Sequence, residues 1–366
     1  MACDQIELAV SGVQQLSPYQ AGKPIEELER ELGITNSIKL ASNENPLGPS
    51  AKALAAARDA LSEVTLYPDA SGHRLKSVLS AKYGLSNDQL TLGNGSNDLL
   101  ELIARVFVRP GDQVIFSEYA FIVYPLVTQA CCAEAVITPA INYGHDLDAM
   151  AAAINEKTRL IYLANPNNPT GTVFTKSELL AFMAKVPETV IVVLDEAYTE
   201  YLTAENMPDG LELVPQFSNL IVTRTFSKAW GLAGLRLGFA YASSQLTDLL
   251  NRVRQPFNVN IAALAAAEAV LDDAEYLAKS RQVNSDGLVQ LANGLSKLGV
   301  EFIPSQGNFI TIDLKQPAMP VYEALLREGV IVRPVGIYKL PNHLRVSVGL
   351  ESENDRFLAA LEKVLG

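Results

Sequence analysis

The feature that most limits the fold of this chain is a series of short apolar runs, rich in Val and Ile, that alternate with amphipathic stretches between residues 50 and 241. Several runs are continuously hydrophobic, as in VIVVLD at 190–195, which is typical of strands covered by helices on both faces. Their alternation with helices indicates a mostly parallel α/β layer. We expect strands within 113–117, 134–139, 158–166, 188–198, 218–228 and 235–243, and helices within 97–108, 124–133, 147–156 and 175–186.

The chain after residue 257 has a different pattern. A long helical stretch at 258–299 leads to strand-like segments within 301–314, 329–334 and 343–349, with one helix among them and another at the end. We therefore predict a large α/β domain at 48–257. A small α+β domain, with an N-terminal arm, would combine 1–47 and 258–366.

Composition excludes several classes of protein. The chain has 29 Lys and Arg against 41 Asp and Glu, a formal charge of −12, which argues against nucleic acid as a partner. Three cysteines are too few for a disulfide framework or a zinc site, so we expect no metal. The N-terminus does not resemble a signal peptide, and no apolar run approaches the ~18 residues of a membrane span. We expect a soluble, cytoplasmic protein that acts on small molecules.

Polar side chains follow two of the predicted strands. Asn168 lies in PNNPTG (166–171), and Asp195 and Tyr198 end the run VIVVLDEAY (190–198). Open α/β sheets gather their ligands at the carboxyl ends of strands, where a buried carboxylate needs a cationic or protonated partner. A simple loop at PNNPTG and a helix N-cap role for Asp195 remain alternatives.

The segment TRTFSKAWGLAGLRLG (223–238) places Thr225, Ser227, Lys228 and Arg236 close together in the sequence. Two hydroxyls and a guanidinium suit a phosphate group. An amine whose pKa is lowered by burial and by neighbouring cations can act as an imine-forming nucleophile. This spacing favours a phosphorylated cofactor whose reactive carbon meets Lys228.

A glycine-rich turn, GNGSND at 93–98, precedes a strong helical pattern. Backbone N–H groups at such a helix start bind phosphate, although the turn is also a common helix cap. As a dinucleotide fingerprint it lacks the third glycine, which disfavours a nicotinamide cofactor.

The order of these elements along the chain resembles that of the fold-type-I aminotransferases, which use pyridoxal 5′-phosphate. The resemblance covers essentially the whole chain, and further motifs make it most similar to the histidinol-phosphate aminotransferases. These motifs are KLASNENPLGPS (39–50), LYPD (66–69), NGSND (94–98), DEAY (195–198), IVRP (331–334) and HLRVSVG (343–349).

The resemblance implies a role for each matching residue around the cofactor ring. Lys228 would be the Schiff-base lysine and the general acid and base, and Asp195 would face the pyridinium nitrogen. Tyr198 and Asn168 would hydrogen-bond the phenolic oxygen of the ring. Tyr119, in SEYAFIVY (117–124), would stack on the ring, although this segment departs from the commoner Pro-Thr-Tyr-x-Met-Tyr pattern.

The resemblance also implies groups that bind anions. The cofactor phosphate would be held by the backbone N–H groups of Ser96 and Asn97 and by the side chains of Thr225, Ser227 and Arg236. Tyr67, from LYPD, would reach the phosphate across a homodimer interface. Substrate would be bound by the anion clamp of Arg333 and Arg345, by Tyr19, and by Asn43 and Asn308.

The implied activity is ping-pong transfer of an amino group between L-histidinol phosphate and 2-oxoglutarate or L-glutamate, in L-histidine biosynthesis. An aromatic amino-acid aminotransferase is the nearest alternative, with Arg345 taking the α-carboxylate and Arg333 mattering less. A phosphothreonine decarboxylase of the same family is a second alternative. A non-enzymatic, cofactor-binding regulatory module is a third, which the filled catalytic positions disfavour.

Overall fold

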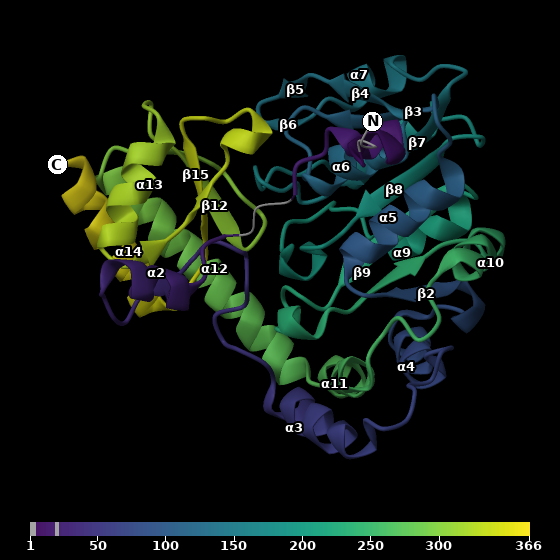
Figure 1. Ribbon diagram of the computed structural model, residues 1–366, viewed down its shortest axis with the longest axis horizontal. Helices are drawn as coiled ribbons and strands as arrows, with labels where there is room; N and C mark the ends of the chain where they lie inside the picture. The colour runs from purple at the N-terminus through teal and green to yellow at the C-terminus, as the bar shows by residue number, and fades with distance from the viewer. Residues whose placement is uncertain (1–4, 19–21) are drawn as a thin grey trace.

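The computed structural model describes residues 5–18 and 22–366 and contains two main sheets (Figure 1). The larger has seven strands in the order β2-β10-β9-β8-β7-β3-β4. Only β10 is antiparallel to its neighbours, β9 and β2, so the sheet is mostly parallel as predicted. The strands are β2 (Leu90–Gly93), β3 (Gln113–Ser117), β4 (Glu134–Thr138), β7 (Thr158–Ala164), β8 (Ile191–Asp195), β9 (Leu220–Thr225) and β10 (Gly238–Tyr241).

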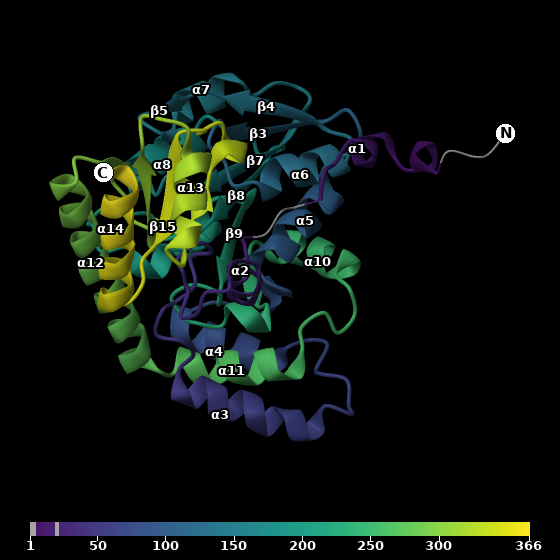
Figure 2. The same ribbon diagram turned by 60° about the vertical axis from the view of Figure 1, so that its left-hand side comes forward.

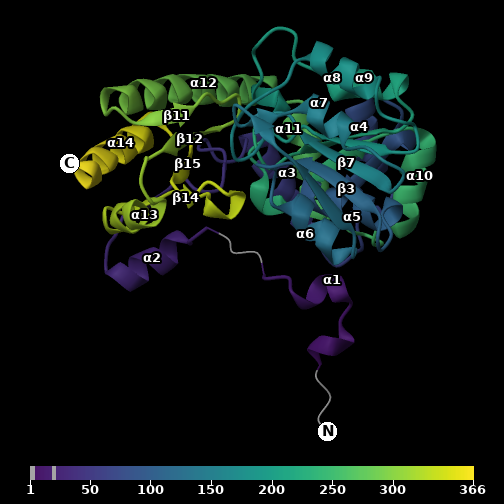
Figure 3. The same cartoon turned by 90° about the horizontal axis from the view of Figure 1, so that it is seen from above.

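Helices cover both faces of this sheet. One face packs against α5 (Ser96–Phe107), α6 (Val123–Ala130) and α10 (Ser244–Val253). The other packs against α4 (His73–Tyr83), α7 (Leu147–Ala152), α8 (Lys176–Met183), α9 (Gly210–Leu213) and α11 (Ile261–Leu271). Figure 3 shows α7, α8 and α9 on one side of β3 and β7 and α5 and α6 on the other. Burial of both faces explains the continuously apolar strands.

Alternation along β8 decides where its last residue points. Ile191 and Val193 lie in the core beneath α5 and α6, whereas Val192 and Leu194 lie in the core on the opposite face. Because side chains alternate along a strand, Asp195 falls on the α5 and α6 face, at the carboxyl end of β8.

The smaller sheet is antiparallel, with the order β11-β12-β15-β14. Its strands are β11 (Glu301–Ile303), β12 (Phe309–Asp313), β14 (Arg333–Pro334) and β15 (His343–Ser347). Its core also takes side chains from α12 (Ala274–Lys297), α13 (Ala318–Arg327) and α14 (Glu351–Leu365). A short parallel pair, β1 (Ile38–Lys39) with β13 (Val330–Ile331), ties the N-terminal segment to it.

The predicted helical stretch at 258–299 is two helices. α11 ends at Leu271, and the side chain of Asp273 accepts a hydrogen bond from the backbone N–H of Tyr276 to begin α12, as an N-cap residue does. α11 lies beside α3 (Ala51–Ala60), and α12 runs from there along the smaller sheet (Figure 2).

The remaining elements are short. In the N-terminal region they are η1 (Ile6–Leu8), α1 (Ser11–Gln14) and α2 (Ile25–Leu32). The hairpin β5 (Ala140–Ile141) with β6 (Gly144–His145) follows β4. The other single turns are η2 (Leu61–Glu63), η3 (Asn87–Gln89), η4 (Thr199–Tyr201), η5 (Val214–Gln216), η6 (Ala233–Leu235) and η7 (Gly336–Tyr338).

Candidate active site

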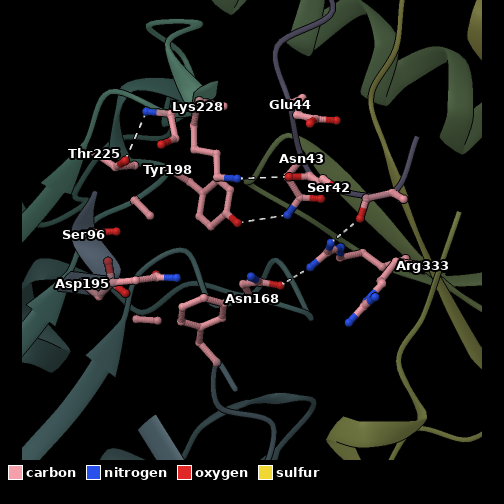
Figure 4. Close-up of a pocket in the computed structure, with 18 of the residues that line it drawn as sticks. Ser42, Asn43, Glu44, Ser96, Asn168, Asp195, Tyr198, Thr225, Lys228 and Arg333 are labelled. Atoms are coloured by element: carbon pink, nitrogen blue, oxygen red, sulfur yellow. Dashed lines mark hydrogen bonds between the residues drawn. The ribbon is translucent and has the colours of Figure 1, made fainter. Parts of the chain in front are cut away.

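A cavity of about 350 Å³ lies between the carboxyl ends of β7, β8 and β9 and the smaller sheet (Figure 4). Parallel strands bring their carboxyl ends to one edge of the sheet, which is why segments distant in sequence meet there. Most of the residues predicted from sequence line it: Asn43, Ser96, Asn97, Asn168, Asp195, Tyr198, Thr225, Ser227, Lys228, Arg236, Arg333 and Arg345.

Lys228 extends into this cavity from the turn after β9. Its Nζ donates a hydrogen bond to the backbone oxygen of Ser42 at 3.2 Å and lies 5.8 Å from the centre of the Tyr198 ring. Burial, followed by the positive charge of Arg345, lowers the pKa of Lys228 to about 7. A large share of this amine is therefore neutral near pH 7, as a nucleophile or proton acceptor must be.

Asp195 is buried at the end of β8, with a side chain that two hydroxyls contact. The Tyr124 hydroxyl donates to Oδ2 at 2.9 Å, and the Thr223 hydroxyl donates to Oδ1 at 3.3 Å. Burial raises the pKa of Asp195 to about 6, although both hydrogen bonds oppose the shift. A cationic group placed against this carboxylate would lower its pKa again.

Tyr198 is buried, and its hydroxyl accepts a hydrogen bond from Asn43 Nδ2 at 3.0 Å. Asn43 comes from the segment that precedes α3 and is itself held by Ser347 of β15 and by Asn308. Burial raises the pKa of Tyr198 to about 12, so the phenol keeps its proton at neutral pH. In Figure 4 the side chains of Lys228, Tyr198 and Asn43 point toward one another.

The start of α5 and the loop after β9 form one end of the cavity. Gly95 has φ +84° and ψ 166°, a conformation that only glycine adopts readily. A Cβ on Gly95 would lie 2.5 Å from Arg236 Nη2, so the glycine lets the guanidinium approach the helix N-terminus. Arg236 Nη1 also donates to Ser227 Oγ at 3.4 Å. Free N–H groups, hydroxyls and a guanidinium converge here, a donor set that suits a phosphate group.

The two arginines of the smaller sheet line the opposite wall. Arg333 of β14 and Arg345 of β15 are directly paired across the antiparallel ladder, which places both side chains on the same face of the smaller sheet. Arg345 is buried and donates to Asn168 Oδ1 and to the backbone oxygen of Ala41, both at 2.6 Å. This wall is positive despite the overall charge of −12, so local charge would attract an anion.

The structure places Tyr119 outside the cavity and Phe121 on its wall. Tyr119 contacts the Tyr143 ring at 5.7 Å and packs beside a cluster formed by Val335, Tyr338 and Leu340. The stacking role of Tyr119 stays a prediction, whereas Phe121 lines the cavity directly. Phe121 precedes α6, and its ring contacts the edge of the Tyr124 ring, with centres 5.8 Å apart.

Two other predicted residues, Asn308 and Tyr67, do not line this cavity. Asn308 donates to the backbone oxygen of Asn43, so it supports the wall from behind. Tyr67 is 81% exposed and stacks on Phe257 with ring centres 4.6 Å apart, away from this cavity. Tyr19 lies outside the described residues.

Some residues of the site were not predicted from the sequence. Ser42, Glu44 and Tyr338 also line the cavity, and Tyr124 contacts Asp195 from α6. Glu44 forms an ion pair with Lys39 at 3.0 Å. Ser42 and Glu44 flank the predicted Asn43, so the SNEN motif contains both, whereas the contact of Tyr124 depends on the packing of α6 on the sheet.

Residues 5–18 and 22–366 make up the described part of the chain. No group of three or more His, Cys, Asp or Glu side chains in this part of the chain could hold a metal ion. None of its helices is both long enough and apolar enough to cross a membrane.

This chain is similar to a known family and to named proteins, and their descriptions agree with one another. Residues 35–361 match the family described as aminotransferase class I and II. Histidinol-phosphate aminotransferase 2 of Pseudomonas fluorescens is 58% identical over 100% of this chain and 99% of its own length. The enzyme of the same name from Haemophilus influenzae is 57% identical over 98% of both chains.

Solved structures agree with these sequence relatives. The histidinol-phosphate aminotransferase of Sinorhizobium meliloti, in complex with pyridoxal 5′-phosphate, superposes with a TM-score of 0.90 at 29% identity, over 97% of this chain and 96% of that one. A Thermus thermophilus aspartate aminotransferase at 22% identity and a TM-score of 0.85, covering 97% of this chain and 99% of its own, shares the fold.

Proposed function

This chain belongs to the aminotransferase class I and II family, and from this premise we propose that it is a pyridoxal 5′-phosphate-dependent aminotransferase. Its substrates would be L-histidinol phosphate and 2-oxoglutarate or L-glutamate, used in turn, in L-histidine biosynthesis. One observation carries the proposal: Lys228 and Asp195 share a cavity with the paired Arg333 and Arg345.

The residues of the cavity fit the cofactor at each of its functional groups. The phosphate would be held by the N–H groups of Ser96 and Asn97, the hydroxyls of Thr225 and Ser227, and the guanidinium of Arg236. The ring would lie against Phe121, with its nitrogen toward Asp195 and its phenolic oxygen toward Tyr198 and Asn168. When bound, the cofactor supplies an aldehyde that bonds covalently to amines and a ring that withdraws electrons from the substrate.

Lys228 would carry out the covalent and proton-transfer work. Because burial and Arg345 lower its pKa to about 7, Nζ can attack an aldehyde at neutral pH. When it is not bonded to the cofactor, the same Nζ would move a proton between the substrate Cα and the cofactor carbon on the other side of the amino nitrogen. Asp195 would supply the negative charge that keeps the ring nitrogen protonated.

The arginine pair would bind both substrates. Each guanidinium can bind a carboxylate or a phosphate through two parallel hydrogen bonds. L-Glutamate presents an α-carboxylate and histidinol phosphate presents a phosphate ester instead, so one positive wall can serve both halves of the reaction. The aromatic aminotransferase and the phosphothreonine decarboxylase are not favoured, because the relatives at 54–58% identity carry the histidinol-phosphate name.

We propose a homodimer in which Tyr67 reaches the cofactor phosphate of the neighbouring subunit. Support comes from exposed apolar side chains near Tyr67, namely Leu61, Val64, Leu66 and Phe257, since clustered exposed apolar residues mark interfaces. Complementation tests it: mixing Lys228→Ala with Tyr67→Ala should restore activity through hybrid dimers that contain one intact site. Failure to complement, or a monomeric mass by sedimentation, would contradict the shared site.

We also propose the two-domain division at 48–257 and at 1–47 with 258–366, and a cytoplasmic location. The separate cores of the two sheets support a division into two domains. The packing of α11 does not follow the boundary after residue 257, because this helix belongs to the core of the larger sheet.

Substrate competition tests the proposed activity. We expect kcat/KM for histidinol phosphate, with 2-oxoglutarate as acceptor, to exceed that for phenylalanine by about a hundredfold or more, because the phosphate would satisfy buried donors that phenylalanine leaves unpaired. Equal or higher values for phenylalanine, or release of CO₂ from phosphothreonine, would reject it.

A further inference from the structure

Tyr124 is a buried side chain of the site to which the family resemblance assigned no role. It lies in the first turn of α6, is 0% exposed, and its hydroxyl donates a hydrogen bond to Asp195 Oδ2 at 2.9 Å. Its ring stacks on that of Tyr162 in β7, with centres 4.4 Å apart and planes 2° from parallel. Phe121 contacts its edge, with centres 5.8 Å apart. Packing on two sides fixes the direction of the hydroxyl.

The fold brings this phenol to the carboxylate. Asp195 points to the sheet face that α6 covers, and Thr223 of the adjacent strand points to the same face. Each Asp195 oxygen therefore accepts one hydrogen bond from a hydroxyl group, Oδ2 from Tyr124 and Oδ1 from Thr223. Donors on both oxygens fix the plane of the carboxylate and leave its remaining lone pairs for a ligand in the cavity.

The same contact affects the charge of Asp195. Burial raises its pKa to about 6, and among the groups that oppose this shift the Tyr124 hydroxyl is the largest, ahead of Thr223 and Lys228. Burial also keeps the pKa of Tyr124 well above its usual value, so Tyr124 remains a donor at all working pH values. A carboxylate that loses this donor has a stronger affinity for a proton.

We propose that Tyr124 is a positioning residue that orients the Asp195 carboxylate and holds it in its ionised form. The inference rests on the proposed function, in which Asp195 faces the ring nitrogen of the cofactor. By keeping Asp195 ionised, Tyr124 favours a proton on that ring nitrogen over a proton on Asp195. The protonated ring withdraws electrons more strongly.

The variant Tyr124→Phe removes only the hydroxyl, and Tyr162→Phe is its matched control. Tyr162 belongs to the same stacked pair, but its hydroxyl donates to the backbone oxygen of Leu100 at 2.8 Å. Each protein is loaded with pyridoxal phosphate labelled with ¹⁵N in the ring. The ¹⁵N chemical shift then reports protonation of the ring nitrogen, next to kcat, KM and the thermal unfolding midpoint.

For Tyr124→Phe we expect the ¹⁵N shift to move toward the value of the unprotonated ring, and kcat to fall about tenfold to a hundredfold, since a hydrogen bond to a charged group is lost. KM should change by less than about threefold. Tyr162→Phe should keep the wild-type ¹⁵N shift even where its stability falls. If Tyr124→Phe fails to fold, Thr223→Val removes the other donor and should move the shift in the same direction, by less.

The outcomes separate this inference from the proposed function. Wild-type protein that takes up no cofactor would overturn both. Loaded wild-type protein with a Tyr124→Phe variant that keeps the wild-type ¹⁵N shift would overturn the role of Tyr124 alone. An equal change of the shift in Tyr162→Phe would also overturn it, because packing of the stacked pair would then be the cause.

Discussion

The variant Gly95→Ala tests how the phosphate end of the cavity is built. At φ +84° and ψ 166°, a non-glycine residue costs about 1–3 kcal/mol of backbone strain. The new Cβ would also lie 2.5 Å from Arg236 Nη2 and 3.3 Å from its Cζ, so the guanidinium must move away from the start of α5. Loss of one charge-assisted hydrogen bond to the phosphate costs about 1.5–3 kcal/mol. The dissociation constant of the cofactor should therefore rise about tenfold to 150-fold.

The control for backbone strain is Gly84→Ala. Gly84 ends α4 at φ +69°, and a Cβ there would meet no atom within 4 Å. Both variants should lower the thermal unfolding midpoint of the cofactor-free protein, whereas only Gly95→Ala should weaken cofactor binding, measured by equilibrium dialysis. Wild-type cofactor affinity in Gly95→Ala, or an equal loss in Gly84→Ala, would refute the placement of Arg236 as a phosphate ligand.

Two further predictions concern the amine and the anion clamp. Burial lowers the pKa of Lys228 from 10.5 to about 7, so between these values this residue binds more protons in the unfolded chain. Its contribution to the free energy of unfolding of the cofactor-free protein should therefore rise with pH across this window and be level below it. Lys228→Met should lack this rise in urea unfolding at several pH values, and identical profiles would contradict the shift. Arg333→Ala should lower kcat/KM for histidinol phosphate about tenfold or more but change that for phenylalanine by less than about threefold. Equal losses in steady-state assays would favour the aromatic aminotransferase instead.

Much of the larger sheet could be predicted because local pattern and fold agree there. Gln113–Ser117 forms β3 with the bounds expected from sequence, and the run around Ile191–Asp195 is continuously apolar because helices cover both its faces. β2 was not predicted as a strand, since Leu90–Gly93 is only four residues long and leads directly into a glycine turn. The break between α11 and α12 was also missed, because the apolar pattern continues on either side of Asp273.

The site was predictable in its residue types more than in its geometry. Lys228, Asp195 and Arg236 lie where motif and strand end coincide, and all three line the cavity. The choice between Tyr119 and Phe121 depends on where α6 begins, which the pattern of aromatic residues does not define to within two positions. The bond from Asn43 to Tyr198 joins residues 155 positions apart, and no local pattern encodes such a contact.

The most direct test of the central claim is to find the lysine that bonds the cofactor. Purified protein loaded with pyridoxal phosphate is reduced with borohydride and digested, and the modified peptide is identified by mass spectrometry. We predict stoichiometric modification of Lys228 and none in Lys228→Ala. Modification of a different lysine, or equal labelling of the Lys228→Ala protein, would contradict the assignment of this cavity as the catalytic site.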